Sequence, residues 1–274
     1  MKVSVIIPTY NFEEKIEQTI NSVLTQEANC EIELIVVDDC STDTTFEICQ
    51  KYGQVYRTKV NSGGPNKGRN IGLEKATGDI ICLLDQDDIW LPGKLQKQLN
   101  EIEKAPIVFC GFSTPTRVYN IKGTPTLYSE NETFVHSLSK NSKNYHLPYT
   151  STLMILKELK HIRFEEKFGM LDWSYILSLC HNNTTIKVNE ILVKKPIAQL
   201  SKNYLYRYHD YNESILICDQ YKNEYPLQVE LAESQINLAF SKFLFEKFKD
   251  HFSKTDTSWL ESRNILRMKI ASKF

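Results

Sequence analysis

Three carboxylates, Asp85, Asp87 and Asp88, stand within four residues at the end of an apolar run. The run, residues 80–84, is continuously hydrophobic, as in a strand that is buried on both faces of a parallel sheet. Because adjacent anions repel one another, such a cluster is unfavourable unless a cation or hydrogen-bond donors compensate it. The cluster therefore predicts a divalent metal site that faces a phosphate-bearing ligand, with a solvated acidic turn as the simpler alternative.

Other polar groups follow strand-like segments in the same way, or open a helix after a glycine-rich loop. They are Thr9-Tyr10, Asp38-Asp39, and Gly64 with Lys67 and Arg69. A helix start presents backbone N–H groups to phosphate, and ligands of parallel α/β sheets bind outside the carboxyl ends of the strands. One edge of the predicted sheet is therefore expected to collect acids for a metal or a base, and cations for phosphate.

Alternating strand and helix signals lead up to the acidic cluster. They give a β-α-β-α-β-α-β order with short connections, which predicts an α/β fold with a parallel sheet and right-handed crossovers. Asn11 with Glu14 resembles a capping box for the first helix. Strands are expected at 3–7, 32–37, 55–60 and 80–84.

Beyond the cluster the pattern predicts a helix, a strand, a polar stretch, and then a strand, a helix and a strand. These lie at 93–105, 107–112, 113–143, 152–156, 173–181 and 188–193. From about residue 227 onward, apolar residues recur at helical spacing among charged ones. We expect one domain over 1–218, with halves 1–115 and 116–218, and a helical C-terminal extension over 219–274.

Composition excludes several classes of protein. A formal net charge of −1 leaves no basic excess to neutralise the phosphates of a nucleic acid. Seven cysteines without a Cys-x-x-Cys pair argue against a disulfide framework and against a thiolate zinc site. The first residues do not resemble a signal peptide, and no run reaches the ~20 apolar residues that span a bilayer. A cytoplasmic protein, at most peripheral to a membrane, is expected.

Four segments together resemble inverting family 2 glycosyltransferases of the GT-A fold. They read Val-Ser-Val-Ile-Ile-Pro-Thr-Tyr-Asn, Val-Val-Asp-Asp-Cys-Ser-Thr-Asp, Gly-Gly-Pro-Asn-Lys-Gly-Arg-Asn-Ile-Gly and Leu-Asp-Gln-Asp-Asp-Ile-Trp, in the family's order. The resemblance implies a Rossmann-like, mixed but mostly parallel central sheet flanked by helices. A dinucleotide-binding dehydrogenase is disfavoured because no Gly-x-Gly-x-x-Gly follows the first strand.

The resemblance also implies a nucleotide-diphosphate sugar donor. It places Asp39 where a carboxylate accepts a hydrogen bond from a uracil N–H, and Asp87, with Asp88, where Mn²⁺ or Mg²⁺ bridges the two phosphates. The residues assigned to the donor are Pro8, Thr9, Tyr10, Asp39, Gly64, Lys67, Arg69, Asp85, Gln86 and Arg207. In the simpler alternatives Asp39 caps the following helix, and the two helix cations are merely solvated.

The segment 164–173 resembles the family's Glu-Asp-Trp element, with Leu171 in place of the usual glutamate. By that match Asp172 is the general base, which deprotonates the acceptor hydroxyl as it attacks the anomeric carbon from the face opposite the nucleotide. The simpler alternative is that Asp172 only caps the helix that Trp173 begins.

Two further segments carry expectations. Residues 206–214 resemble a Tyr-Arg-x-His element, by which Arg207 reaches the diphosphate or His209 the metal; the alternative is that His209 is a surface residue. Residues 255–274 suggest a basic amphipathic helix. Such a helix docks on an anionic membrane or, alternatively, packs on the main domain or in a homodimer.

These features predict a metal-dependent, inverting glycosyltransferase that moves a sugar from a UDP-sugar to a hydroxyl of a glycan or lipid-linked acceptor. The resemblance alone suggests bacterial lipopolysaccharide, O-antigen or capsule synthesis. One alternative is a sugar-phosphate nucleotidyltransferase, which ordinarily carries a glycine-rich loop after its first strand, where this chain has Pro8-Thr9-Tyr10-Asn11. The other is a non-catalytic protein that binds nucleotide sugars.

Overall fold

The computed structural model describes residues 1–115, 123–139, 147–168, 171–195 and 204–252, without the side chains of 204–207, 209 and 244–252. Contacts between Cα atoms divide the chain into two compact units. Unit 1 comprises Met1–Ser137 and Ser142–Leu200, and unit 2 comprises Leu138–Asn141 and Ser201–Phe274. Unit 2 thus includes residues upstream of 219, where the sequence placed the start of the helical extension, because one continuous helix crosses that position.

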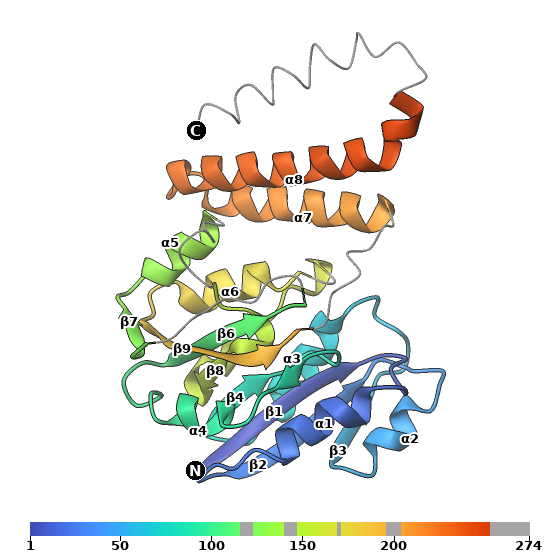
Figure 1. Ribbon diagram of the computed structural model, residues 1–274, viewed down its shortest axis with the longest axis vertical. Helices are drawn as coiled ribbons and strands as arrows, with labels where there is room; N and C mark the ends of the chain where they lie inside the picture. The colour runs from blue at the N-terminus through green and yellow to red at the C-terminus, as the bar shows by residue number, and fades with distance from the viewer. Residues whose placement is uncertain (116–122, 140–146, 169–170, 196–203, 253–274) are drawn as a thin grey trace. The chain divides into compact units, whose positions relative to one another are not determined.

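Unit 1 is built around one mixed sheet (Figure 1). Its parallel strands along the first part of the chain are β1 (Lys2–Thr9), β2 (Glu31–Asp38), β3 (Gln54–Arg57) and β4 (Ile80–Leu83). The others are β5 (Ile89–Trp90), β6 (Ile107–Ser113), β7 (Thr126–Tyr128), β8 (Met154–Leu156) and β9 (Thr185–Lys194). The strand order is β3-β2-β1-β4-β8-β6-β9-β5, with β7 beside β9. Strand β8 is antiparallel to β4 and β6, so the predicted mixed sheet is confirmed.

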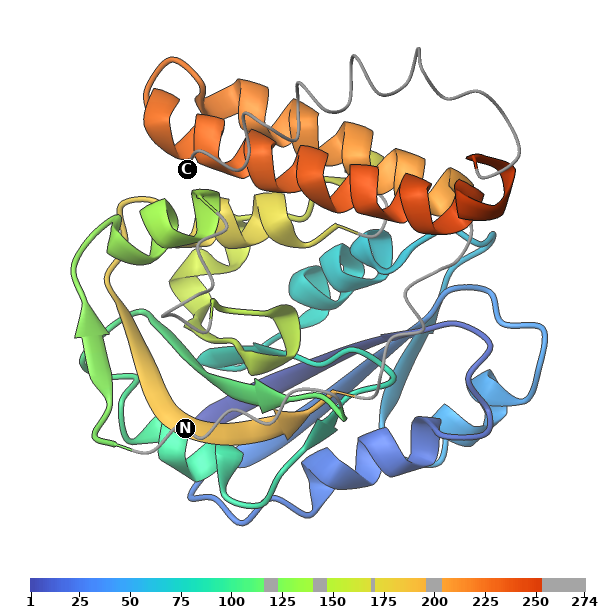
Figure 2. The ribbon, with the colours of Figure 1, turned by 45° about the horizontal axis from the view of Figure 1, so that its top comes forward.

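Helices cover both faces of this sheet (Figure 2). One face carries α1 (Ile16–Leu24), α2 (Thr45–Cys49) and α4 (Lys94–Leu99), and the other carries α3 (Pro65–Lys75) and α6 (Trp173–Cys180). Helix α5 (Glu132–Leu138) and strand β7 lie in the stretch 113–143, for which the sequence indicated only a polar character. The α/β class and the flanking helices are confirmed.

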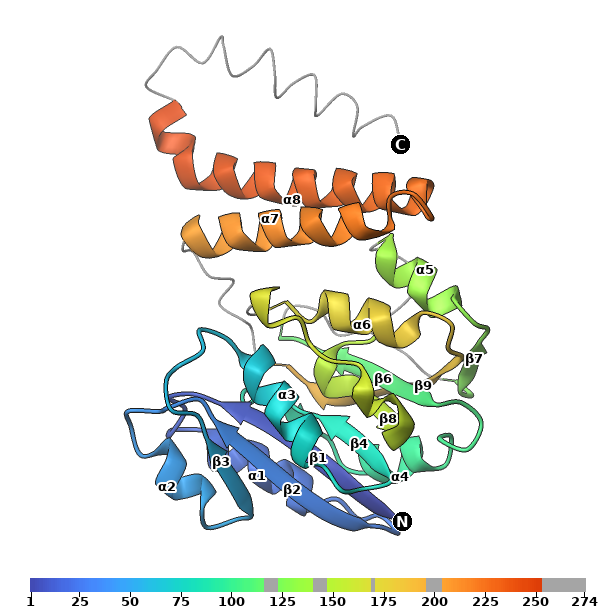
Figure 3. The ribbon, with the colours of Figure 1, turned by 180° about the vertical axis from the view of Figure 1, so that it is seen from behind.

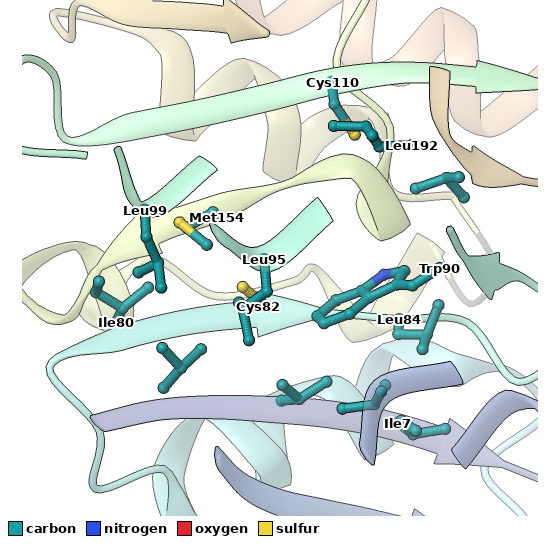
Figure 4. Close-up of a cluster of buried hydrophobic side chains, with 14 of the residues drawn as sticks. Ile7, Ile80, Cys82, Leu84, Trp90, Leu95, Leu99, Cys110, Met154 and Leu192 are labelled. Atoms are coloured by element: carbon teal, nitrogen blue, oxygen red, sulfur yellow. The ribbon is translucent and has the colours of Figure 1, made fainter. Parts of the chain in front are cut away.

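A continuous hydrophobic core lies on the face that α1 and α4 cover. Val3, Val5 and Ile7 of β1 belong to it, as the two-residue alternation of a strand requires. The core continues through Leu84 and Trp90 on either side of the acidic cluster (Figure 4). The acidic loop is therefore held at both ends by buried apolar side chains. All seven cysteines are free thiols, in agreement with the absence of a disulfide framework.

Helix α3 packs on β1 and β2 at very short range (Figure 3). A Cβ atom at Gly72 would lie 2.2 Å from Cγ2 of Ile6, and one at Gly68 would lie 3.1 Å from Cβ of Pro8. Glycine at these two positions therefore lets the helix backbone approach the strand. This approach brings the first turns of α3, with Arg69, beside the carboxyl ends of β1 and β4.

A buried carboxylate, Glu33, fixes β1, β2 and the turn after α3 to one another. It is 7% exposed and accepts hydrogen bonds from Ser4 Oγ (2.5 Å), Thr77 N (2.9 Å) and Thr77 Oγ1 (2.6 Å). Lys2 Nζ lies 2.9 Å from its Oε1. Burial alone would raise the pKa of Glu33, but these donors outweigh burial and lower the pKa from 4.5 to about 2.

Stability in acid should therefore depend on Glu33. Because the folded-state pKa is depressed, its stabilisation is complete above about pH 4.5 and is lost as the pH falls towards 2. We expect Glu33→Gln to lower the free energy of unfolding by at most about 3 kcal/mol at pH 7, and by progressively less below pH 4.5. Urea denaturation between pH 3 and 7 measures the free energy of unfolding of both proteins. A difference between wild type and variant that stays constant over this pH range would contradict the assignment.

Unit 2 contains two long helices, α7 (Tyr204–Tyr221) and α8 (Pro226–Phe252). They pack along each other with Ile217 and Val229 fully or almost fully buried, and the Tyr211 ring stacks on Phe240 with centroids 4.5 Å apart. Helix α8 matches the helical spacing expected from residue 227, whereas α7 was not predicted as a helix. Among the helices of the described residues, none has the length and apolar character needed to cross a membrane.

Candidate functional site

The acidic cluster lies in the loop between β4 and β5, and a buried arginine of α3 reaches it. Arg69 is 3% exposed, and its Nη2 donates to Asp85 Oδ1 at 2.6 Å. The phenol of Tyr149 donates to the other carboxylate oxygen at 2.7 Å. Burial alone would raise the pKa of Asp85, but the Arg69 guanidinium and these hydrogen bonds bring it below the ordinary value. Asp85 is therefore an ionised, fully partnered carboxylate rather than part of a solvated turn.

Four consecutive hydroxyl residues, Tyr149 to Thr152, follow a stretch that the sequence left without assignment. Beside the Tyr149 contact, Ser151 Oγ donates to Asp88 Oδ2 at 2.5 Å, and Thr150 Oγ1 donates to Asp172 Oδ2. Ser151 Oγ also accepts from the backbone N–H of Asp85 at 3.0 Å. Sequence reasoning missed this hydroxyl segment, although the run Tyr-Thr-Ser-Thr directly before the predicted strand 152–156 was a signal that could have found it.

Asp87 and Asp88 differ from Asp85 in that, among the described residues, neither forms an ion pair. No hydrogen bond from another described residue reaches the Asp87 carboxylate, and Oδ1 of Asp88 is buried without a partner. Burial and the neighbouring Asp85 charge raise the pKa of Asp87, and raise that of Asp88 to about 7. A bound cation would relieve both conditions, so these two carboxylates fit a divalent metal.

The protein part of such a metal site is small. Among the described residues, no group of three His, Cys, Asp or Glu side chains is arranged to hold a metal. The fit is therefore to an ion bound by one or two carboxylates and completed by substrate phosphates and water, as is usual for Mg²⁺. His209, the third predicted ligand, lies in α7 with its side chain outside the described part of the chain, as does that of Arg207.

Asp172 occupies the N-cap position of α6 but makes no capping hydrogen bond with its side chain. Its carboxylate instead accepts from Thr150, the neighbour of the tyrosine that holds Asp85. The Asp172 charge also contributes to the raised pKa of the Arg69 guanidinium. The simpler interpretation, in which Asp172 only caps its helix, is therefore not supported by the contacts. A carboxylate that is held beside the acidic loop and has acceptor capacity left can accept a proton.

Asp39 lies directly after β2, is 6% exposed, and does not cap α2, whose N-cap is Thr44. Thr58 Oγ1 donates to its Oδ1 at 2.9 Å, and the N–H and Oγ of Ser62 each donate to its Oδ2 at 2.8 Å. A carboxylate accepts about four hydrogen bonds, so capacity for one more remains. The capping alternative is wrong, and Asp39 is fixed in one orientation by the loop before α3.

The other residues of unit 1 that are assigned to the donor lie along the same edge. Thr9 Oγ1 and the N–H of Tyr10 both donate to Gln86 Oε1, at 2.9 and 2.8 Å, which ties the end of β1 to the acidic loop. Tyr10 is 41% exposed, so its side chain is accessible from solvent. Pro8 lies at the end of β1, and Gly64 and Lys67 lie at the N-cap and in the first turn of α3.

Lys195 is a cation that the sequence reasoning did not single out. It directly follows β9, and its Nζ lies 3.4 Å from the centre of the Tyr149 ring. Although burial raises the pKa of the acids in the loop, the Lys195 charge acts in the opposite direction on Asp85, Asp87 and Asp88. Lys195 and Arg69 are thus two cations beside the acids of the loop.

Comparison with known proteins gives this site a family. The chain matches the model of the family described as Glycosyl transferase family 2 over residues 4–164. The poly(ribitol-phosphate) beta-N-acetylglucosaminyltransferase TarS of Staphylococcus aureus is 47% identical over 94 residues, 32% of this chain and 16% of that protein. The putative teichuronic acid biosynthesis glycosyltransferase TuaG of Bacillus subtilis is 38% identical over 143 residues, 49% of this chain and 52% of that protein. The matches thus span about half, or much less, of these relatives.

Solved structures agree on the fold. TarS 1–349 of S. aureus in complex with UDP-GlcNAc has a TM-score of 0.67 at 25% identity, covering 94% of this chain and 77% of that chain. The mannosyltransferase PcManGT of Pyrobaculum calidifontis has a TM-score of 0.62 at 17% identity, covering 97% of this chain and 80% of that chain, and bears on the fold alone. With a GT-A fold and a family match that covers more than half of its length, the chain belongs to glycosyl transferase family 2.

Proposed function

We propose that this protein transfers a sugar from a UDP-sugar to an acceptor hydroxyl with inversion at the anomeric carbon. The observation that carries the proposal is the hydroxyl segment Tyr149–Thr152. In this segment Tyr149 donates a hydrogen bond to Asp85 on the donor side. The next residue, Thr150, donates one to Asp172 on the acceptor side. A base for the acceptor is thereby kept next to the loop that receives the donor.

The proposed reaction is a single displacement. Asp172 accepts the proton of the acceptor hydroxyl, whose oxygen attacks the anomeric carbon from the face opposite the diphosphate. As the new glycosidic bond forms, the bond between the anomeric carbon and the phosphate oxygen breaks, and UDP leaves with that electron pair. One carboxylate suffices for this step, whereas glycoside hydrolysis needs two. Lys67 and the N-terminus of α3 lie at the glycine-rich loop, where they favour the negative charge of the diphosphate.

A divalent metal would complete the charge balance on the leaving side. Asp87 would hold Mn²⁺ or Mg²⁺. Asp88 would either be a second ligand or hold the acidic loop in place through its hydrogen bond with Ser151. When bound, the ion neutralises negative charge that develops on the leaving nucleoside diphosphate. The contact of Arg207 with the diphosphate and that of His209 with the metal stay predictions.

The choice of UDP rests on Asp39 and on the relatives. Asp39 retains acceptor capacity for one N–H, and uracil provides one at its N3, whereas N3 of cytosine carries no proton. A solved structure that is 25% identical to this chain, that of TarS, contains UDP-GlcNAc. We therefore propose a uridine nucleotide, with N-acetylglucosamine as the first sugar to test.

The biological setting is proposed at the level of cell-surface polymers. Two relatives are named for teichuronic or teichoic acid synthesis. They are the putative glycosyltransferase TuaG and the minor teichoic acid biosynthesis protein GgaB of B. subtilis, which is 32% identical over 179 residues, 60% of this chain and 19% of that protein. This favours an anionic wall polymer over the lipopolysaccharide that the sequence suggested. The glycan or lipid-linked acceptor and the homodimer stay predictions. The basic amphipathic helix at 255–274, with its docking on an anionic membrane, also stays a prediction, and residues 255–274 lie outside the described part of the chain.

A panel of UDP-, dTDP-, GDP- and CMP-sugars, each with and without Mn²⁺, tests this function. We expect metal-dependent release of UDP from one UDP-sugar and no release of the other nucleotides. Release of pyrophosphate from UTP and a sugar phosphate would instead identify a nucleotidyltransferase. Binding of UDP-sugars without turnover, in the presence of teichoic-acid acceptors, would support the non-catalytic alternative.

Asp87 is expected to carry the metal dependence. Replacing it by Asn should lower UDP release by about 10²–10³-fold at saturating Mn²⁺, and should abolish the effect of Mn²⁺ on UDP affinity, because an amide binds the ion far less well than a carboxylate. Calorimetric titration of UDP with and without Mn²⁺ measures the second effect. Asp219→Asn, which removes one exposed carboxylate from α7, is the matched control. An Asp87→Asn protein that still binds UDP more tightly with Mn²⁺ would exclude Asp87 as the ligand.

A further inference from the structure

Asn66 is a buried residue to which neither the sequence motifs nor the proposed reaction assigns a role. It lies in the first turn of α3, only 1% exposed. Its Oδ1 accepts from Arg69 Nη1 at 2.8 Å, and its Nδ2 donates to the carbonyl oxygens of Glu165 and Leu171, both at 3.1 Å. A side-chain amide has one acceptor oxygen and two N–H donors, so each of its polar groups is used.

The two ends of this network belong to different sides of the reaction. On the donor side, the same Arg69 guanidinium donates to Asp85 at 2.6 Å. On the acceptor side, Leu171 is the residue directly before Asp172, and no capping hydrogen bond from the Asp172 side chain fixes the start of α6. The amide of Asn66 is therefore a short connection between the donor loop and the backbone that carries the base.

Neighbouring contacts from α3 fix the start of the base-bearing segment, while Thr150 holds the Asp172 carboxylate at its end. Asn70, one turn further along α3, exchanges hydrogen bonds of 2.9 Å with the backbone N–H and C=O of Phe164. The Phe164 ring lies beneath Arg69 and stacks on Tyr175 of α6 with centroids 3.7 Å apart. These contacts fix residue 164, whereas Asn66 reaches residue 171.

We propose that Asn66 is a positioning residue, which sets the place of Asp172 relative to the donor by holding the Leu171 carbonyl while its oxygen fixes Arg69. The inference rests on the proposed function. Proton transfer and in-line attack depend on the separation of base, acceptor and anomeric carbon, and a displacement of about 1 Å is enough to slow such a step about 10²-fold. The role of Asn66 is therefore in the rate of transfer rather than in donor binding.

Asn66→Asp tests this role with almost no change in shape. The variant keeps an oxygen for Arg69 but replaces the two N–H donors by an oxygen that repels the carbonyls of Glu165 and Leu171. We expect kcat for transfer to fall by about 30- to 100-fold, with KM for the UDP-sugar and the Kd of UDP changed by about two-fold at most. Amide hydrogen exchange at residues 171–176 should become faster. Asn100→Asp, which adds the same charge at an exposed position after α4, should behave as wild type.

A second variant covers the case in which the carboxylate prevents folding. Asn66→Ala removes the amide without adding a charge. Because Arg69 keeps its hydrogen bond to Asp85, kcat should still fall much more than KM rises. Equal losses in kcat and UDP affinity, or wild-type kcat in either variant, would overturn the positioning role. Failure of the proposed function would give a different result. In that case the wild-type protein would release no UDP from any UDP-sugar, or Asp172→Asn would transfer sugar at the wild-type rate.

Discussion

Asp172→Asn is expected to abolish sugar transfer, with a fall in rate of about 10³–10⁴-fold at neutral pH. The substituted amide has the shape of the carboxylate and still accepts the hydrogen bond from Thr150, so the start of α6 and the donor loop should keep their geometry. An amide, however, cannot take the proton of the acceptor hydroxyl. UDP affinity should therefore stay within about two-fold of wild type, since only the transition state loses an interaction. Transfer rates and calorimetric UDP binding measure the two quantities.

The Asp172→Asn result needs a control for indirect damage. Thr150→Val removes the hydroxyl that holds the carboxylate but leaves the base itself. We expect a much smaller loss, about ten-fold, because a less well oriented base still accepts a proton. If Asp172→Asn transferred sugar at the wild-type rate, Asp172 would not be the base. If it lost UDP affinity in parallel, its role would be structural.

Arg69→Met is expected to have the largest effect on stability. The guanidinium is 3% exposed and is paired with Asp85, so its removal leaves a buried carboxylate without its cation. Breaking one partner of a buried ion pair lowers the free energy of unfolding by about 3–5 kcal/mol. In wild type Arg69 and the hydrogen bonds keep the pKa of Asp85 low against burial, whereas in the variant burial should raise it. The loss should accordingly shrink as the pH falls and Asp85 takes up a proton.

The double variant Arg69→Met, Asp85→Asn separates charge from packing. Because no unpaired charge remains, it should recover most of the stability that the single variant loses, although donor binding stays impaired. Urea denaturation at pH 7 and pH 5 for all three proteins measures the cycle. A single variant as stable as wild type, or a double variant that is additively worse, would contradict the buried pair as described.

The strands and the acids at their ends were predictable because both signals are local. An apolar run such as 80–84 can only be a buried strand in this context, and the carboxyl ends of parallel strands meet at one edge whatever the loops do. The order of strands and helices up to Leu84 followed in the same way, whereas the short strand β5 was not predicted. The position of Asp172 next to a helix start was equally visible in the sequence.

The contacts that define the site were not predictable, because they join residues far apart in sequence. Tyr149 and Ser151 bond to Asp85 and Asp88 across more than sixty positions. Asn11 and Glu14 illustrate a local rule that fails: the predicted capping box is wrong, since α1 begins only at Ile16 with Lys15 as its N-cap. Asn11 is used elsewhere, because its Oδ1 accepts from the Thr42 N–H at 2.8 Å in the neighbouring loop. Tertiary contacts thus outweigh a short-range motif.

Helix α7 shows a similar limit in unit 2. The segment 206–214 has no clear amphipathic pattern, since aromatic, acidic and polar residues follow one another without a single apolar face. Its helical state depends on packing against α8, to which Tyr211 contributes a ring contact with Phe240 and a hydrogen bond to Asn237. Helix propensity alone, without knowledge of the partner helix, could not predict that α7 is a helix.

A crystal structure with Mn²⁺ and a non-hydrolysable UDP-sugar tests the central claim most directly. We predict the uracil N3–H on Asp39, an anomalous manganese peak bound to Asp87 and the diphosphate, and Asp172 as the nearest carboxylate to the anomeric carbon, on the face opposite the leaving phosphate. A uracil ring away from Asp39, or an anomeric carbon that faces a carboxylate other than Asp172, would contradict the account.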